Sequence, residues 1–462
     1  MAKLGIVITD GVGFRNFVLS DFLREAQHQW EEVVILSFLP HSIYKKHIHC
    51  RVIELPVLQE SFVTWFFRKA KELAHLQLHK RGNFGITDNL LTNSSTSRSP
   101  RGRATRLLLK WTAHFHSEAW IARYTKQQQR QFRNKAVTRS YTDLLQAENF
   151  DLLFFTHQRP PYLAPLAYVA QRLSIPMASF IFSWDNLASK GRMAADFDYY
   201  LVWSELMKSE LLQFYSRVRP ENIEVVGTPQ FEPYILTRYH TTKAEFHSRF
   251  GLEQSKKTIC FSCGDISTSK NDERYIRILA EAIRADQIPN AQLLVRTSPA
   301  EDPVRFRELA NTYTFIIWNY PDWNLSREGH PEPWSQRVPT EGDVRDLRAL
   351  LQHCDLNINM LSTMSLDFMQ FNKPVINPVF GNPENGLYND QRFLKYAHIE
   401  HLVESGATKI VKNETELLEA VGYYLENPEA DSENRSALTA LEVGCPLEGT
   451  GKRMASTLKK WI

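Results

Sequence analysis

The stretch DLNINMLSTMSLDFMQFNKPVINPVF, residues 355–380, decides the fold that the sequence predicts. It reads as a short alternating strand over 356–359, a serine-rich turn, a helix that opens at Leu366 and a new strand from Val375. Lys373-Pro374 ends the helix, because proline cannot continue it. This order of strand, turn, helix and strand is typical of a parallel sheet with helices on its faces.

The turn within this stretch has the composition of an anion site. A helix N-terminus exposes unpaired N–H groups and carries partial positive charge, which suits a phosphate or diphosphate. The hydroxyls of Ser362, Thr363 and Ser365 add donors, and Asp367 is placed to accept a hydrogen bond from a sugar hydroxyl. The alternative is an N-capped helix whose serines only satisfy its own first turn.

The same alternation of strands and helices recurs on both sides of this stretch. Before it come strands at 4–9, 33–38, 52–55, 151–156, 176–182, 198–203, 223–226, 258–263, 292–296 and 315–318. The first strand leads through Asp10 to Gly13 into a helix over about 14–26, and this turn lacks the third glycine of a dinucleotide fingerprint. The pattern predicts an α/β protein with two Rossmann-like, doubly wound domains facing a cleft.

Two interruptions define the domain organisation. Residues 1–228 form the N-terminal domain, and within it the rhythm breaks over about 60–148, which reads as a helical insertion with one long helix over 104–147. The proline-containing run 229–242 reads as a linker, and 243–462 forms the second domain. The final basic helix, about 451–461, is a candidate to return to the N-terminal domain.

The helical insertion is strongly basic over 101–135, where Glu118 is the one acidic residue. The basic residues are Arg101, Arg103, Arg106, Lys110, Arg123, Lys126, Arg130, Arg133 and Lys135. A solvated helix face is one interpretation. Attraction to an anionic membrane surface or to a phosphorylated acceptor is the other, and tryptophans at 65, 111 and 120 fit a membrane surface.

Composition narrows the class of protein. The 462 residues carry a formal charge of +3, which is too small to indicate a nucleic-acid partner. No apolar run is long enough to span a membrane, and the N-terminus lacks the pattern of a signal peptide. We therefore expect a cytoplasmic protein, with peripheral contact at the inner face of the membrane as an option. The five cysteines include a lone CxxC at Cys260 and Cys263, which predicts structural cysteines rather than zinc ligands.

In a doubly wound domain, ligands bind at the carboxyl ends of the strands. The loops expected there are 10–16, 183–192, 264–269 and 362–367, and Arg296 with Ser298 also follows a strand. The glycine of the first loop, Gly13, lets a ligand or the backbone approach closely.

At these loops the chain resembles glycosyltransferases of the two-Rossmann (GT-B) type. Two motifs are similar to those of CDP-glycerol glycerophosphotransferases and their polysaccharide-transferase relatives. Trp184-Asp185-Asn186 followed by Lys190-Gly191 occupies a place similar to that of their W-H-G-T-P-x-K-x-x-G loop, and 362–367 with 296–299 is similar to their D-Y-S-S-x-x-x-D turn and arginine strand. Aspartate replaces the catalytic histidine of that loop, which favours a nucleotide-sugar donor. Nucleotide-sugar epimerases are also similar in fold, but their H-x-E-A-G-x-R loop is absent.

The resemblance implies a site with acceptor-side and donor-side residues. Asp185 is the expected base, with Asp10 as second and His157 as third candidate, and Lys190 would contact phosphate or the donor sugar. The expected donor-binding residues are Gly13, Gly264, Ser267, Arg296, Ser298, Ser362, Thr363, Ser365 and Asp367. No D-x-D motif follows a strand and no E-x7-E flanks the donor turn, so we expect no metal, no cofactor and inversion at the transferred carbon.

The predicted function is transfer of a sugar from a nucleotide-diphosphate sugar to a glycan or lipid-linked acceptor in surface polysaccharide or glycoconjugate biosynthesis. Three alternatives stay open. They are transfer of a polyol phosphate from a CDP-linked donor, an epimerase-like reaction on a UDP-sugar, and a non-catalytic scaffold that binds a partner through the basic insertion.

Overall fold

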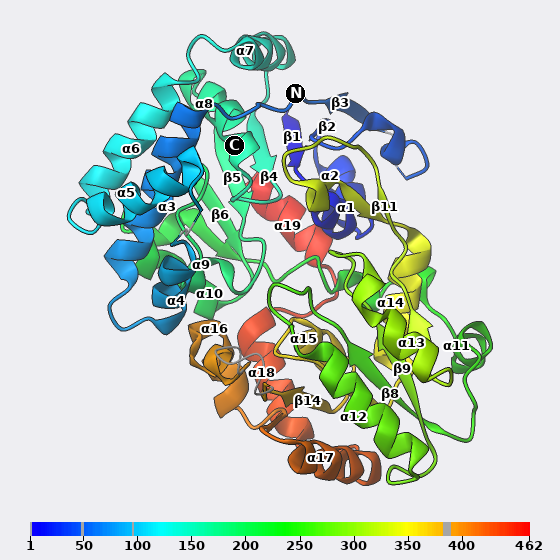
Figure 1. Ribbon diagram of the computed structural model, residues 1–462. Coiled ribbons are helices and arrows are strands. Elements are labelled where there is room, and N and C mark those ends of the chain that lie inside the picture. The colour runs from blue at the N-terminus through cyan, green and yellow to red at the C-terminus, as the bar shows by residue number, and fades with distance from the viewer. Residues whose placement is uncertain (1, 48–49, 95–96, 382–389) are drawn as a thin grey trace. The chain divides into compact units, whose positions relative to one another are not determined.

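The computed structural model describes residues 2–47, 50–94, 97–381 and 390–462. They form two compact units, both visible in Figure 1. The first unit consists of Met1–Pro229, Ser326–Gln336 and Glu442–Ile462, and the second of Gln230–Leu325 and Arg337–Leu441. The chain therefore returns twice to the first unit, and no sequence pattern indicates the earlier return.

Parallel strands form the sheet of the first unit, in the order β3-β2-β1-β4-β5-β6-β7. The strands are β1 Lys3–Ile8, β2 Glu32–Ser37, β3 Arg51–Glu54, β4 Leu152–Phe155, β5 Met177–Phe180, β6 Tyr199–Val202 and β7 Ile223–Val225. In the register, Leu4 of β1 lies between Val33 of β2 and Leu152 of β4. β4 is apolar and buried throughout, as expected for a strand with helices on both faces.

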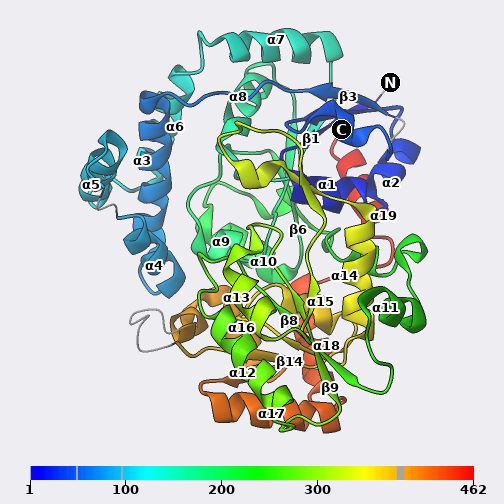
Figure 2. The same ribbon diagram turned by 45° about the vertical axis from the view of Figure 1, so that its right-hand side comes forward.

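The helices of the first unit are α1 Gly11–Val18, α2 Phe22–Gln29, α3 Phe62–His79, α4 Phe84–Thr92, α5 Pro100–Thr112, α6 Glu118–Arg130, α7 Ala136–Glu148, α8 Ala164–Arg172, α9 Asn186–Ser189, α10 Glu205–Phe214 and α19 Thr450–Lys459. The connection from β3 to β4 contains α3 to α7. Within it, α3 packs against α5 and α6, and α5 lies on the outer side of α3 (Figure 2).

Two helix predictions in this unit are wrong. The single helix expected over 14–26 is two helices, because the Ser20 hydroxyl accepts a hydrogen bond from the Phe22 N–H and turns the chain between α1 and α2. The long helix expected over 104–147 is three helices, since Ser117 caps a new helix and Lys135 leaves the helical region again.

The C-terminal helix α19 packs against α2. Gly451 makes this approach feasible, because a Cβ there would lie 2.5 Å from the backbone nitrogen of Phe22. Trp461, just after the helix, stacks on Tyr199 with ring centroids 4.6 Å apart. The C-terminus is thereby part of the first unit.

The second unit has a parallel sheet in the order β10-β9-β8-β13-β14-β15. Its strands are β8 Lys257–Ser262, β9 Ala291–Arg296, β10 Ile317–Asn319, β13 Leu356–Ile358, β14 Val375–Pro378 and β15 Lys409–Val411. Its helices are α11 Lys243–Phe250, α12 Asp272–Arg284, α13 Arg307–Thr312, α14 Glu341–His353, α15 Met364–Met369, α16 Ala397–Glu404, α17 Glu414–Glu426 and α18 Ser432–Val443. The predicted fold class, α/β with two Rossmann-like doubly wound domains, is confirmed.

Residues 321–340 contain a short antiparallel pair, β11 Trp323–Leu325 and β12 Arg337–Pro339. Three-residue strands are too short for their alternation to be recognised in the sequence. The residues between them, Ser326–Gln336, belong to the first unit. None of the helices within the described ranges combines the length and the apolar character needed to cross a membrane.

Candidate functional site

The first unit brings two candidate residues together at the point where its strand order reverses. From β1 the chain continues to β2 and β3 on one side, while β4 and its successors occupy the other side. Open α/β sheets bind ligands at this switch point, outside the carboxyl ends of the strands. Asp10 follows β1 and His157 follows β4, so both residues lie there.

Asp10 is fully buried and caps α1. One carboxylate oxygen accepts the Gly13 N–H at 2.8 Å, and the other accepts the Thr9 hydroxyl at 2.8 Å and lies 2.9 Å from Nδ1 of His157. Burial raises the pKa of Asp10, but His157 and the two other donors outweigh it, so the pKa lies below the ordinary 3.8. Asp10 is therefore an ionised acceptor that fixes a proton on Nδ1 of His157.

His157 has the environment of a neutral base. Its ring stacks on Phe182, with centroids 3.8 Å apart and planes 11° apart, and it is 6% exposed. Burial lowers the pKa of His157 below 6.5, although its bond with Asp10 opposes the fall. The described residues offer Nε2 no hydrogen-bond partner. A neutral imidazole with Nδ1–H held by a carboxylate leaves the lone pair of Nε2 for an incoming proton.

Asp185 and Lys190, the first choices from the sequence, lie on the loop after β5. Asp185 precedes the short helix α9 and its carboxylate lies 3.1 Å from Nζ of Lys190. The Asn186 amide donates to Asp185 at 2.9 Å and accepts from Gln158, the neighbour of His157, at 3.0 Å. The negative charge of Asp185 is close enough to favour protonated His157. Asp185 and Lys190 therefore flank the Asp10–His157 pair.

Gly13 does not offer its backbone to a ligand. Its N–H is the donor to Asp10, and a Cβ at this position would lie 3.0 Å from the hydroxyl of Thr156. The glycine lets α1 start close to the end of β4, where the two catalytic candidates meet. Its expected donor-binding role is therefore not supported.

In the second unit, the switch point lies between β8 and β13, where the serine-rich turn follows β13. A buried amide network holds this turn. Asn359 accepts from the Ser362 N–H at 2.8 Å and donates to Asn357 at 2.7 Å, and Asn377 donates to the Asn359 carbonyl at 2.8 Å. Leu361 in the turn has a φ of 48°, a left-handed conformation that a non-glycine residue rarely adopts.

This network uses part of the predicted phosphate cradle. Ser365 is fully buried and its hydroxyl bonds with Asn359. Asp367 is 3% exposed and accepts a hydrogen bond from the Tyr234 hydroxyl. Both side chains face the interior of their own unit, so the structure does not support their roles as donor ligands. Ser362 and Thr363 are partly exposed and remain candidates.

Arg296 also faces inward. Its guanidinium binds the Asp343 carboxylate at 2.9 and 3.1 Å and donates to Asn319. Because this charge is buried and neutralised within the unit, it is not available to a diphosphate. Ser298, 8% exposed, accepts the Ala300 N–H at 3.2 Å and stays a prediction.

The loop after β8 satisfies its own N–H groups. The Gly264 N–H donates to Asp272 at 2.9 Å, and the Ser267 N–H donates to Asp265 at 2.8 Å. Carboxylates already occupy the positions that the sequence interpretation gave to phosphate oxygens. Ser267, which is exposed, and Gly264, which is half-buried, would have to exchange these partners to bind a donor.

Within the described ranges, no three His, Cys, Asp or Glu side chains are grouped to hold a metal ion. The expected metal independence stays a prediction. Cys260 and Cys263 are both buried and unpaired by disulfide.

Comparisons with solved structures support the GT-B class. A putative UDP-N-acetylglucosamine 2-epimerase from Listeria monocytogenes has a TM-score of 0.56 at 10% identity, covering 99% of this chain and 96% of that one. UDP-GlcNAc 2-epimerase from Neisseria meningitidis, bound to UDP-GlcNAc, has a TM-score of 0.55 at 12% identity, covering 99% and 100%. A glycosyltransferase from Rickettsia africae ESF-5 has a TM-score of 0.52 at 11% identity, and the match covers 99% of this chain and 98% of that one.

At such low identity the likeness establishes the fold alone, two Rossmann-like domains of GT-B type. No protein-family model matches the sequence, and no curated protein matches it.

Proposed function

We propose that this protein is a glycosyltransferase that moves a sugar from a nucleotide-diphosphate donor to a hydroxyl of a glycan or lipid-linked acceptor, with inversion and without a metal. The observation that carries the proposal is the Asp10–His157 pair at the switch point of the first unit. A positioned base is worth about 10²–10⁴-fold in rate, and a neutral histidine is the usual group.

In the proposed reaction, Nε2 of His157 accepts the proton of the acceptor hydroxyl while its oxygen attacks the anomeric carbon of the donor. The bond from that carbon to the diphosphate oxygen breaks, and the nucleoside diphosphate leaves with the electron pair. Asp10 stabilises the resulting imidazolium through Nδ1–H. On the donor side, Ser362 and Thr363 at the switch point of the second unit are the proposed phosphate contacts, and Lys190 is a further cation for the donor.

The fold neighbours give a second candidate, epimerisation of a UDP-sugar, because two of the three named above carry that activity in their names. Epimerisation breaks and remakes a C–H bond, so it would incorporate solvent deuterium into the sugar without any acceptor. Transfer breaks no C–H bond. Deuterium incorporation from heavy water therefore separates the two reactions.

The experiment is a ligand panel followed by turnover. UDP-, GDP-, dTDP- and CMP-sugars, CDP-glycerol and CDP-ribitol are compared for their effect on the melting temperature, and stabilising compounds are then tested for nucleotide release. We expect one nucleotide sugar to stabilise and to turn over. If only a CDP-polyol stabilises the protein, transfer of a polyol phosphate is favoured. If no compound stabilises it, the non-catalytic scaffold is the remaining alternative.

The proposal includes contact of the helices α3, α5 and α6 with an anionic membrane surface. A groove of about 660 Å³ there is lined by Phe66, Phe67, Leu107, Leu108, Trp111, Trp120, Arg123, Tyr124 and Gln127. On α5, Leu107 is 59% and Trp111 46% exposed. Glu118, the lone acid of this basic segment, is neutralised by Arg192 at 2.8 Å.

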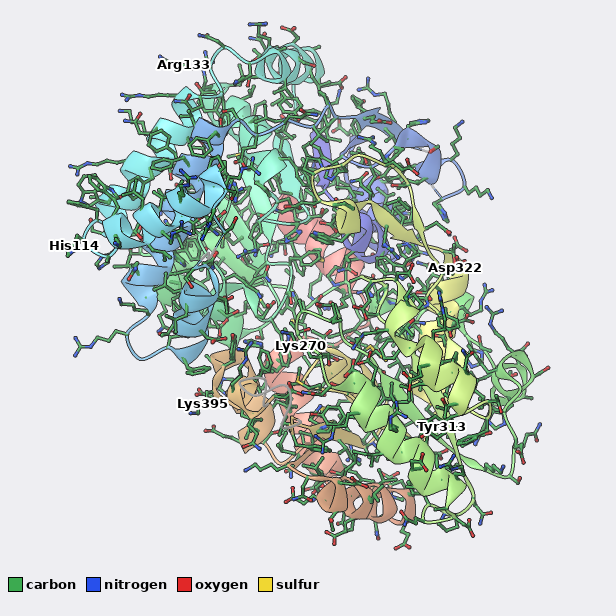
Figure 3. The ribbon with its side chains drawn as sticks, viewed as in Figure 1. His114, Arg133, Lys270, Tyr313, Asp322 and Lys395 are labelled. Carbon is green, nitrogen blue, oxygen red and sulfur yellow. The ribbon has the colours of Figure 1, made fainter. Side chains whose placement is uncertain are left out.

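Exposed aromatic and basic side chains on one helical surface suit an interface with anionic lipid. His114 and Arg133, which follow α5 and α6, point outward from this surface (Figure 3). Vesicles with phosphatidylserine should bind the protein and neutral vesicles should bind it less. Trp111→Ser should weaken this binding, whereas Tyr423→Ser on α17, with equal exposure, should not. Equal binding of both variants would contradict the contact.

A further inference from the structure

A pocket of the first unit lies next to the Asp10–His157 pair and has no role in the chemistry above. It holds about 350 Å³, within the usual range for small-molecule sites. Its lining residues include Glu60, Trp65, Arg68, Arg101, Tyr162 and Glu332. Tyr162 connects it to the pair, because the Tyr162 hydroxyl donates to the carbonyl of Thr9, the residue before Asp10, at 2.9 Å.

One side of this pocket is aromatic. Trp65 on α3 and Tyr162 both line the pocket, and both are otherwise packed in the protein, at 8% and 4% exposed. The Arg101 guanidinium lies 5.5 Å from the Trp65 ring centroid and has no carboxylate partner among the described residues. Such a wall suits the apolar face of a flat or ring-shaped ligand.

The lining also carries a carboxylate, that of Glu332. Its side chain has no hydrogen-bond or ion-pair partner within the described part of the chain. Arg68 is already occupied, because it binds Glu60 at 2.7 and 2.8 Å and Glu72 at 2.8 Å. Burial raises the pKa of Glu332. The charge of Arg68 lowers this pKa, and the charge of Asp10 raises it further. Because the described residues leave the Glu332 carboxylate without a donor, its oxygens can accept hydrogen bonds from a ligand.

Glu332 is held in place by the returning segment Ser326–Gln336. Its N–H donates to Nδ1 of His330 at 3.1 Å, and the Ser335 hydroxyl donates to its carbonyl at 2.7 Å. The His330 ring meets Tyr162 edge-on at 5.0 Å. The segment that leaves the second unit thus completes a pocket of the first unit, and its internal hydrogen bonds fix the backbone that carries the Glu332 side chain.

We propose that this pocket binds the acceptor and that the acceptor is a neutral saccharide. Its ring would pack against Trp65 and Tyr162, and its hydroxyls would donate to Glu332. Within the described residues, the lining has one carboxylate without a cation partner, that of Glu332, and one guanidinium without a carboxylate partner, that of Arg101. These opposite charges leave little net charge to attract an ionic ligand and suit a neutral ligand with hydroxyls, and a charged lining disfavours an acyl chain. The acceptor role rests on the proposed function, whereas saccharide binding does not.

The first test measures binding without any donor. Methyl glycosides of glucose, galactose, mannose and their N-acetylated hexosamines are presented to the full chain, and saturation-transfer NMR reports contact. We expect at least one to bind, and Glu332→Ala to weaken it roughly ten- to hundredfold, as for loss of hydrogen bonds to a charged group. Glu328→Ala, in the same segment but outside the pocket, is the matched control and should bind normally. No binding by the wild type, or equal binding by both variants, overturns the pocket.

The second test measures the acceptor role. The ratio of sugar transfer to donor hydrolysis is measured with the glycoside that binds. We expect this ratio to fall at least tenfold in Glu332→Ala and in Trp65→Leu, with melting temperatures recorded to confirm folding. An unchanged ratio overturns the acceptor role. The wild type can fail to turn over any donor and still bind a glycoside in a way that Glu332→Ala weakens. That result overturns the proposed function and the acceptor role, but not the saccharide pocket.

Discussion

Replacement of Asp10 by asparagine tests how the proposed base is positioned. Asparagine has the same shape and caps a helix as well as aspartate does, so it can keep the bond to the Gly13 N–H. What it loses is the charge that faces Nδ1 of His157 at 2.9 Å. The amide can offer N–H to the ring instead of accepting from it, which would favour the tautomer with the proton on Nε2.

The magnitude follows from the roles assigned to the two residues. A base in the wrong tautomer loses most of the 10²–10⁴-fold that general base catalysis contributes, or about 3–5 kcal/mol of transition-state stabilisation. The free energy of unfolding should change by less than about 2 kcal/mol, since the cap is retained. The loss should therefore appear in kcat, while the protein stays folded.

The assay is donor turnover with the nucleotide sugar that the panel identifies, followed at saturating donor for wild type, Asp10→Asn and Asp143→Asn. Asp143 is an exposed residue of α7 and serves as the matched control. Melting temperatures are measured for all three. A folded Asp10→Asn protein with kcat within about threefold of the wild type would refute the claim that Asp10 sets the state of His157.

Three further outcomes are expected. First, burial holds the pKa of His157 below 6.5, and only neutral His157 can accept a proton. The value of kcat/KM should therefore stay level as the pH falls to 6.5 and decline only below it. A decline centred above 7 would contradict this. Second, Asp343→Asn leaves the buried Arg296 without its carboxylate partner. This change should lower the free energy of unfolding by about 3–5 kcal/mol. An unchanged unfolding midpoint together with a raised KM for the donor would show instead that Arg296 binds the donor. Third, burial and the nearby Glu442 raise the pKa of Glu210 from its ordinary value of 4.5 to about 8. The folded protein should therefore lose stability as the pH rises from about 4.5 to about 8, whereas Glu210→Gln should not. The melting temperature of Glu210→Gln should exceed that of the wild type by more at pH of about 9 than at about 6, and a pH-independent difference would contradict this.

The fold could be predicted because its signal is local. β1, β2 and β4 are apolar runs bounded by turns, and such runs identify strands of a sheet covered on both faces. The helix boundaries were harder to predict, because Ser20 and Ser117 act through single hydrogen bonds to nearby N–H groups. Periodicity does not report such bonds.

The candidate site was only partly predictable because its partners are distant in sequence. Asp10 and His157 were both recognised at strand ends, but their pairing depends on β4 lying beside β1, which the sequence does not specify. Only the order of the strands in space makes the third-ranked histidine the best base. Asp185 stands where the resembling motif has its catalytic histidine, so the sequence alone favours the neighbouring loop.

The donor turn shows a different limit. A serine-rich turn before a helix fits a phosphate site and a buried polar network equally well. A signal for the network was present, because Asn357, Asn359 and Asn377 fall within or beside buried strands, where an amide must find partners inside the protein. Ser365 is one of those partners. Arg296 has the same explanation, since its partner Asp343 belongs to a helix that begins 45 residues later, at Glu341.

The most direct test of the central claim is the rate of donor turnover in His157→Gln. Glutamine approximates the size of the ring but cannot accept a proton at neutral pH. We expect this variant to bind the donor as the wild type does, judged by the same shift in melting temperature, and to turn it over at least about a hundredfold more slowly. Turnover at the wild-type rate would show that the Asp10–His157 pair is structural and that the reaction takes place without it.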